Sequence, residues 1–279
     1  MKYAIACLLL TSTTFAAEVQ TRKDISYCEP AGKRHQLDVT APQTGKDHPV
    51  IVWIHGGGWA RGDKSNVQKK PQVFADRGFV FVSVNYRFLP EVTIQEMTGD
   101  IAKAIHWVHD HAREYGGNPE EIIVMGHSAG AHLAALVCTD DSYLKAEGLP
   151  LSILKGCVPV DVSVYDIPKR LKDGGALSAK RIKKLFGETE AGWQKLSPAL
   201  HVEEGKQIPP FLILHVADRK DTRVQSEHFA QVLREAKISA TVVAAEGKTH
   251  GTINSELGIP DDKPSTAIYE FLDRVTGKK

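Results

Sequence analysis

Short apolar runs alternate with longer amphipathic segments along most of the chain, and this alternation constrains the fold more than any other feature. Runs suited to β-strands occupy residues 35–39, 50–55, 79–85, 122–126, 153–160, 210–216 and 240–245. Helical patterns occupy residues 72–77, 94–115, 129–138, 223–237 and 265–275. Strands that alternate with helices of this length imply right-handed crossovers, so the sequence predicts an α/β fold with a mostly parallel sheet and helices on both faces.

Two departures from this alternation are informative. Strand-like residues 24–27 and 35–39 flank Ala31 and Gly32, which predicts an antiparallel hairpin at the sheet edge. Residues 161–207 hold only short helical pieces interrupted by prolines and glycines. An insertion of that length in a compact domain is usually functional, so we expect a small helical cap over one site.

The first 17 residues have the pattern of a secretory signal peptide. Lys2 precedes a short apolar run, and Thr14 and Ala16 are small residues suitably placed before a cleavage point. The alternative is a buried N-terminal strand. We therefore expect a secreted or periplasmic protein whose residues 18–279 form one domain, with no segment apolar and long enough to span a bilayer.

Cleavage there removes Cys7 and leaves three of the 4 cysteines, an odd number that excludes a complete disulfide framework. Cys138 and Cys157 lie in apolar runs and are expected to be small buried hydrophobes. The 35 Lys and Arg residues against 34 Asp and Glu give a formal net charge of +1. No overall field therefore attracts nucleic acid or an anionic membrane, and a small-molecule partner is expected. The oligomeric state is left open.

The strongest chemical motif runs from Gly126 to Gly130, Gly-His-Ser-Ala-Gly. It follows a strand run and opens an Ala- and Leu-rich helix, which is the context of a nucleophile elbow. The serine of such an elbow lies on a strained turn that needs small neighbours. Ser128 is therefore the predicted nucleophile, and the alternative is a Gly-Ser turn that only caps a helix.

A second motif, His-Gly-Gly-Gly-Trp, begins at His55 directly after the strand run 50–54. Consecutive glycines let backbone N–H groups face a ligand without Cβ obstruction, as an oxyanion hole requires. We expect the amides of Gly57, Gly58 and Ala129 to form it, His55 to hold the loop, and Trp59 to line the substrate pocket. A phosphate loop is disfavoured because Asp63 stands where that motif needs lysine.

A serine on a nucleophile elbow needs an acid and a base, which follow it in the chain. His250 lies in a polar loop after the last strand run and is the predicted base. The acid has three candidates: Asp218, which is favoured because it follows the strand run 210–216 closely, Asp221 at an expected helix start, and Asp161 after the run 153–160. The acid therefore stays open, with Asp218 preferred.

These motifs resemble those of the α/β-hydrolase superfamily, in particular secreted carboxylesterases with an HGGG loop, close to the hormone-sensitive-lipase-like and bacterial feruloyl-esterase-like groups. The resemblance runs from about residue 35 to the C-terminus. It implies ester hydrolysis through an acyl-enzyme by Ser128, Asp218 and His250, without a cofactor, on short-chain acyl or plant-derived acetyl or feruloyl esters. The segment between His215 and Asp218 is one residue shorter than the family's pattern.

Several rival functions are weighed against this expectation. An amidase, peptidase or formamidase would use the same residues, and a non-catalytic binding protein would use the same fold. Lipase action is disfavoured because the cap is polar and basic. His106 and His109 share a helical face but lack further ligands, so no metal site is expected. Seven basic residues accompany one acid in residues 169–184, a pattern more typical of a solvated helix face than of steering an anionic substrate.

Overall fold

The computed structural model describes residues 18–278, so the predicted signal peptide lies outside the described part of the chain. One eight-stranded sheet runs through it in the order β1-β2-β4-β3-β5-β6-β7-β8. The strands are β1 (Val19–Ser26), β2 (Gln36–Pro42), β3 (His48–Ile54), β4 (Val80–Val84), β5 (Gly117–His127), β6 (Leu154–Val160), β7 (Phe211–Val216) and β8 (Ala240–Ala245). β1 and β2 pair antiparallel, as the predicted edge hairpin requires, β2 pairs antiparallel with β4, and every other pair is parallel.

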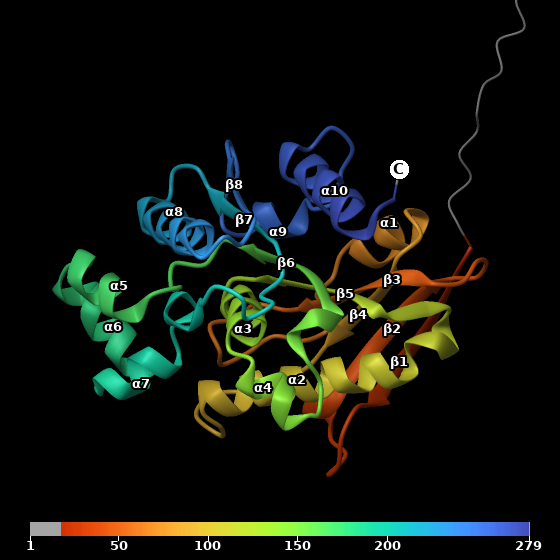
Figure 1. Cartoon of the computed structure of the whole chain (residues 1–279), viewed down its shortest axis with the longest axis horizontal. Helices are drawn as coiled ribbons and strands as arrows, with labels where there is room; N and C mark the ends of the chain where they lie inside the picture. Colours follow the sequence, from red (N-terminus) through yellow and green to blue (C-terminus); the bar gives the residue numbers. More distant parts are fainter. Residues whose placement is uncertain (1–17, 279) are drawn as a thin grey trace, which may run out of the picture.

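The helices are α1 (Lys70–Asp76), α2 (Ile94–His111), α3 (Ala129–Thr139), α4 (Ser142–Ala146), α5 (Ile167–Asp173), α6 (Ala176–Phe186), α7 (Glu190–Lys195), α8 (Lys220–Glu235), α9 (Thr252–Ser255) and α10 (Lys263–Thr276). They cover both faces of the sheet (Figure 1). Residues of α2, α3 and α8 belong to one core, and residues of α1, α9 and α10 belong to the other. The predicted α/β architecture is therefore confirmed.

Side-chain alternation along the central strands produces these two cores. On β3, Val50, Val52 and Ile54 face the core that contains α2 and α3, whereas Ile51 and Trp53 face the core that contains α1 and α10. All of these side chains are essentially inaccessible to solvent. A strand buried on both faces needs a continuous apolar run, which explains why residues 50–54 carry no polar residue.

Cys138 and Cys157 are buried within the first core, and both remain free thiols, as does the half-buried Cys28. Burial raises the pKa of the Cys157 thiol, so the thiol stays protonated. The prediction that Cys138 and Cys157 act as small hydrophobes is confirmed. In the described part of the chain, no helix has both the length and the apolar character needed to cross a bilayer.

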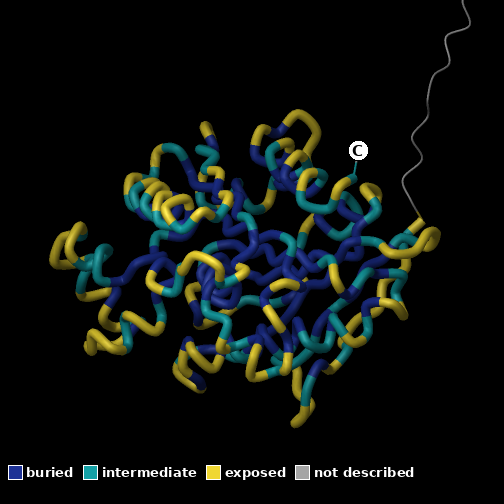
Figure 2. Tube along the Cα trace, viewed as in Figure 1, coloured by how far each residue is buried: buried dark blue, intermediate teal, exposed yellow. Residues whose placement is uncertain are grey.

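Residues 161–207 contain α5, α6 and α7, which lie together beside α8 at one end of the molecule (Figure 1). These three helices are more exposed than the sheet, whose strands form the buried centre (Figure 2). Only Ile167, Ile182 and Phe186 are buried among their residues. We call α5 to α7 the helical insertion below.

One boundary differs from expectation in a way that affects the site. The sequence pattern predicts that the helix after β7 begins at Arg223 with Thr222 as its N-cap, but α8 already begins at Lys220. The hydroxyl of Thr222 instead donates a hydrogen bond of 3.0 Å to the carbonyl oxygen of Arg219. The connection from β7 to α8 is therefore only residues 217–219.

Candidate active site

Ser128 lies at the sharp turn between β5 and α3, with φ of 56° and ψ of −120°. Positive φ is unfavourable for a residue with a side chain, so neighbouring structure must enforce it. A Cβ at Gly126 would lie 2.4 Å from the carbonyl oxygen of Gly130, and one at Gly130 would lie 2.2 Å from that of Ile54. Only glycine fits at these two positions, which accounts for the small residues on either side of the serine.

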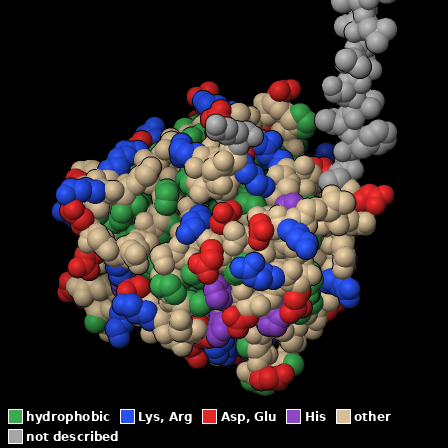
Figure 3. All heavy atoms as spheres, turned by 45° about the vertical axis from the view of Figure 1, so that its right-hand side comes forward, with side chains coloured by type: hydrophobic (Ala, Val, Ile, Leu, Met, Phe, Trp, Pro, Cys, Tyr) green, Lys and Arg blue, Asp and Glu red, His purple; other side chains and the backbone are tan. Residues whose placement is uncertain are grey.

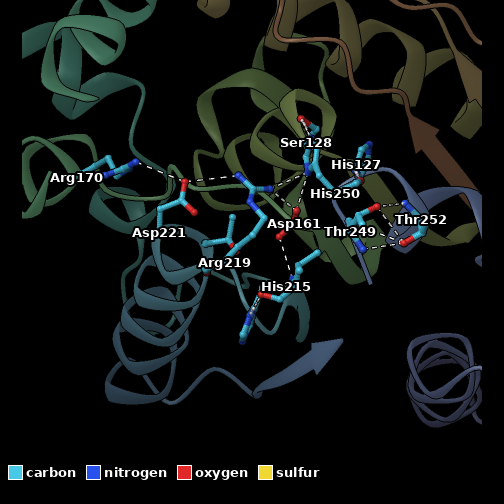
Figure 4. Close-up of polar contacts among 12 residues, drawn as sticks. His127, Ser128, Asp161, Arg170, His215, Arg219, Asp221, Thr249, His250 and Thr252 are labelled. Carbon is cyan, nitrogen blue, oxygen red and sulfur yellow. Dashed lines mark hydrogen bonds and ion pairs between the residues drawn. The ribbon is translucent and has the colours of Figure 1, made fainter. Parts of the chain in front are cut away.

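Ser128 Oγ is 3.0 Å from Nε2 of His250, in the loop between β8 and α9 (Figure 4). Nδ1 of the same ring is 2.6 Å from Oδ2 of Asp161. A carboxylate only accepts, so Nδ1 carries the proton and the lone pair of Nε2 faces the serine hydroxyl. This tautomer can remove the serine proton. The structure thus brings together the predicted nucleophile and the predicted base.

The acid differs from the favoured prediction. Asp161 follows β6 directly and is fully buried, whereas Asp218 is exposed and makes no contact with His250. The early start of α8 explains this, because a three-residue connection leaves no loop to carry a carboxylate from the end of β7 back to the histidine. Asp221, in the first turn of α8, faces Arg170 and Arg219 at 3.5 Å each. Asp161, the third candidate, replaces Asp218 as the partner of His250.

Asp161 is held in place by the sheet. Its amide donates to the carbonyl of Leu214 at 2.7 Å, and its Oδ1 accepts from the amide of Val216 at 3.0 Å. Burial alone would raise the pKa of Asp161, but the hydrogen bonds from His250 and Val216 and the charge of Arg219 lower that pKa to about 2. The carboxylate is therefore ionised throughout the neutral pH range.

Arg219 is a part of the site that the sequence patterns do not single out. Its Nη1 contacts Oδ2 of Asp161 and lies 2.8 Å from Nδ1 of His250. Nη1 of Arg219 and Nδ1 of His250 both carry protons, so both donate to the same oxygen, Oδ2 of Asp161. Its Nη2 faces Asp221, which in turn faces Arg170 of α5 (Figure 4). A chain of alternating charges therefore connects the histidine partner to the helical insertion.

The backbone of His250 is held by a hydrogen bond from His127, the residue before the nucleophile. Nε2 of His127 is 2.8 Å from the carbonyl oxygen of His250 and donates to it. Burial, followed by the nearby His250, lowers the pKa of His127 to about 3, so its ring is neutral. His127 is thus a buried neutral donor beside the reactive groups. His132, the other histidine near the nucleophile, donates instead to Leu196 at 2.8 Å.

The glycine loop follows β3 and approaches the nucleophile. Gly57 and Gly58 have φ of 135° and 64°, values that favour glycine. Within residues 18–278, no acceptor is bound to the amides of Gly57, Gly58 or Ala129, and Ala129 is the first residue of α3. His55 binds the carbonyl of Gly56 through Nδ1 at 2.7 Å, which confirms that it holds the loop.

Ser128 and His250 open into a cleft of about 590 Å³. Gly58 and Trp59 line it from the glycine loop, and α6 of the helical insertion lines it as well. Trp59 lines this cleft as predicted, with its ring packed edge-on against Phe186 at 5.1 Å. Across residues 18–278, no cluster of three or more His, Cys, Asp or Glu side chains is placed to hold a metal ion.

The parallel sheet, the elbow after β5 and the Ser–His–Asp chain at the strand ends define an α/β-hydrolase fold. Solved esterases share this fold: esterase B from Lactobacillus rhamnosis with a bound inhibitor superimposes with a TM-score of 0.77 at 20% identity, covering 93% of this chain and 88% of that one. A truncated carbohydrate esterase from gut microbiota gives 0.76 at 20% identity, covering 94% and 98%. The model of the BD-FAE family matches residues 37–234, most of the chain, which therefore belongs to that family.

Curated relatives are also similar in sequence. A probable carboxylic ester hydrolase, LipM, from Mycobacterium tuberculosis is 32% identical over 79% of this chain. A probable isoprenylcysteine alpha-carbonyl methylesterase from rice is 31% identical over 78% of the chain. The chain spans 53% and 55% of the lengths of these two relatives, so the match covers about half of each.

Proposed function

We propose that the protein hydrolyses carboxylic esters through an acyl-enzyme formed on Ser128. The observation that carries this proposal is the hydrogen-bonded chain from Ser128 Oγ to His250 at 3.0 Å and from His250 to Asp161 at 2.6 Å, placed beside a glycine loop with unpaired amides. The names of the relatives as ester hydrolases and membership of the BD-FAE family support the same chemistry.

The residues present account for each step. His250 takes the hydroxyl proton as Oγ of Ser128 attacks the ester carbonyl, and the amides of Gly57, Gly58 and Ala129 stabilise the resulting oxyanion. The imidazolium is stabilised by Asp161 and then gives the proton to the leaving alcohol. A water molecule then attacks the acyl carbonyl while His250 takes one of its protons, and His250 passes this proton to Oγ of Ser128 as the acyl C–O bond breaks, which releases the acid and restores the serine hydroxyl.

We expect short-chain acyl esters or accessible acetyl and feruloyl esters as substrates. Side chains such as Trp59 and Leu185 give the cleft an apolar part of its lining, against which an acyl or aryl group can pack. The helical insertion is proposed to act as the cap that limits acyl length. Residues 1–17 have the pattern of a signal peptide, and we infer that the protein is exported; mass spectrometry of the N-terminus after expression in the native host tests this.

A substrate panel tests the function. It contains chromogenic acyl esters of increasing chain length, a feruloyl ester, an acetylated sugar, an aryl formamide and a peptide anilide, each assayed with the wild type and with Ser128→Ala. We expect ester hydrolysis that falls with chain length and is lost in the variant. Wild-type rates in Ser128→Ala, or a wide preference for the anilide, would overturn the proposal.

A further inference from the structure

The cleft beside Ser128 is lined by more positive charge than the reaction itself needs. Arg170 and Arg181 line it from α5 and α6, and Arg219 lines it from the connection before α8. The only carboxylates among its lining residues are Asp161 and Asp221. Three guanidinium groups therefore face two carboxylates within one cavity.

Both carboxylates already have partners. Asp161 is bound by His250, by the amide of Val216 and by Arg219. Asp221 lies 3.5 Å from Arg170 and 3.5 Å from Arg219. Both carboxylates are thus paired with groups of the site other than Arg181. Neither of them neutralises the charge of Arg181.

Two cationic donors are left over. Arg181 is exposed at the cleft and has no ion pair within the described residues. Nε of Arg170 is buried and has no hydrogen-bond partner there either. Of these two groups, Arg181 is the one exposed at the cleft, so its guanidinium is available to an anionic group of a ligand.

This arrangement is not a by-product of a generally basic surface. Of the seven basic residues between positions 169 and 184, only Arg170 and Arg181 line the cleft. Lys169 pairs with Asp173 at 2.6 Å, and Lys183 lies over the ring of Trp193. On the face of the molecule shown in Figure 3, basic and acidic side chains are interspersed. The two cleft residues are both arginines, whose planar fork matches a carboxylate in geometry.

A second hollow of about 490 Å³ extends the cleft, with Arg170, Ser178 and Asp221 shared between the two. Its further polar lining residues are Lys220, Asp173, which pairs with Lys169, and Gln225, whose buried Nε2 also lacks a partner within the described residues. The oxygen of the same amide accepts from the amides of Tyr165 and Asp166, so Nε2 is the free end. The space beside Ser128 therefore extends between the helical insertion and the first turns of α8.

We propose that the preferred ester carries a carboxylate on the part that extends from the scissile carbonyl toward the helical insertion, where Arg181 binds it and Arg170 adds positive charge to the cleft lining. The apolar side chains of Ile182 and Leu185, which also line the cleft, pack against the intervening carbon chain. This inference rests on the proposed esterase function and specifies its substrate class.

Two matched pairs of esters test it, one for each half of a substrate. 4-Carboxyphenyl acetate is compared with its methyl ester, and 4-nitrophenyl hemiglutarate with 4-nitrophenyl pentanoate. Each pair is assayed with the wild type, with Arg181→Gln, and with Lys180→Gln as the control. Lys180 is the exposed neighbour of Arg181 on α6 and does not line the cleft, so both variants lose one charge from the same helix.

For one of the two anionic esters, we expect the KM of Arg181→Gln to be about three- to tenfold higher than that of the wild type. A loss of this size is typical of a partly exposed charge-assisted contact. The neutral partner ester and the Lys180→Gln variant should show no such rise. Comparing variants on one ester removes differences in intrinsic reactivity between esters. Equal effects of Arg181→Gln on both members of each pair would overturn the inference. If no ester is hydrolysed at all, the proposed function fails instead, so the two failures are distinct.

Discussion

The amide of Val216, the last residue of β7, donates a hydrogen bond of 3.0 Å to Oδ1 of Asp161, which directly follows β6. The end of one strand thus holds the carboxylate that projects from its neighbour. This bond orients Oδ2 toward His250 and fixes the acid without any loop. Substitution of each carboxylate in turn tests whether Asp161 or Asp218 acts as the acid.

Asp161→Asn should lower kcat by about 10⁴-fold, because an amide in place of the carboxylate no longer selects the useful tautomer of His250 or stabilises its charged form. Asp218→Asn should stay within about twofold of wild type, since Asp218 is exposed and the carboxylate on His250 is that of Asp161. Steady-state kinetics with 4-nitrophenyl acetate measure both, and thermal unfolding shows whether each variant is folded. A larger loss in Asp218→Asn than in Asp161→Asn would contradict the assignment.

Two adjacent glycines should respond differently to the same substitution. A Cβ at Gly57 would lie 1.8 Å from the carbonyl oxygen of Arg61, whereas one at Gly58 has no atom within 4 Å. Gly57→Ala must therefore move the loop and misplace its amides, and we expect kcat to fall by about 10²–10³-fold. Gly58→Ala should lose less than tenfold. Parallel kcat values provide the check, and similar losses in both variants would show that the Gly57 contact is unimportant.

His127 should act as a positioning residue through its 2.8 Å hydrogen bond to the carbonyl of His250. His127→Phe removes the donor and should lower kcat by about 10- to 100-fold with little change in KM, because a displaced base slows chemistry rather than binding. His127→Gln restores a donor and should recover part of the loss. A purely structural role predicts instead that both variants lose activity in proportion to their stability, which thermal unfolding would reveal.

Lys70 should make folding stability depend on pH. Its side chain is fully buried, with Nζ 2.8 Å from the carbonyl of Asn254, and burial lowers its pKa to about 7. The unfolded chain has a lysine pKa of about 10.4, so between these values only the unfolded state is protonated. The penalty of burying Lys70 is thus complete below pH 7 and disappears toward about pH 10.

Lys70→Met lacks this titration. The free energy of unfolding of the wild type should rise relative to that of Lys70→Met as pH increases from 7 to 10, as measured by urea denaturation at several pH values. Lys69→Met, an exposed neighbour, is the matched control and should leave the slope unchanged. A constant difference between wild type and Lys70→Met over this range would mean that Lys70 does not titrate there.

The features encoded in consecutive residues are those that sequence reasoning predicts well. The elbow needs a strand, five residues with two glycines and a helix, all of them adjacent in the chain, so Ser128 is recognisable without a structure. The glycine loop after β3 is local in the same way. The alternation of strands and helices predicts the fold class in the same way, because the hydrophobic period that distinguishes a strand from a helix is visible within a single element.

The acid depends on geometry that is not local. Asp161 and Asp218 both follow apolar strand runs, and composition does not distinguish them. What separates them is the start of α8 at Lys220, which shortens the connection after β7, and the pairing of β6 with β7, which places the amide of Val216 against the carboxylate of Asp161. The one signal in the sequence is the segment after His215, one residue shorter than the family's pattern. Arg219 carries no motif of its own and becomes visible only once these strands are paired.

Ser128 and Asp161 occupy equivalent places on adjacent strands, each one residue past the strand end, with φ of 56° and 53°. A hydrogen bond of 2.9 Å from the amide of Ser128 to the carbonyl of Val160 couples the two turns. The distance between nucleophile and acid is thereby set by the sheet. The helical insertion does not set that distance, so it can change in length and charge during evolution or in engineering while Ser128 and Asp161 keep their spacing.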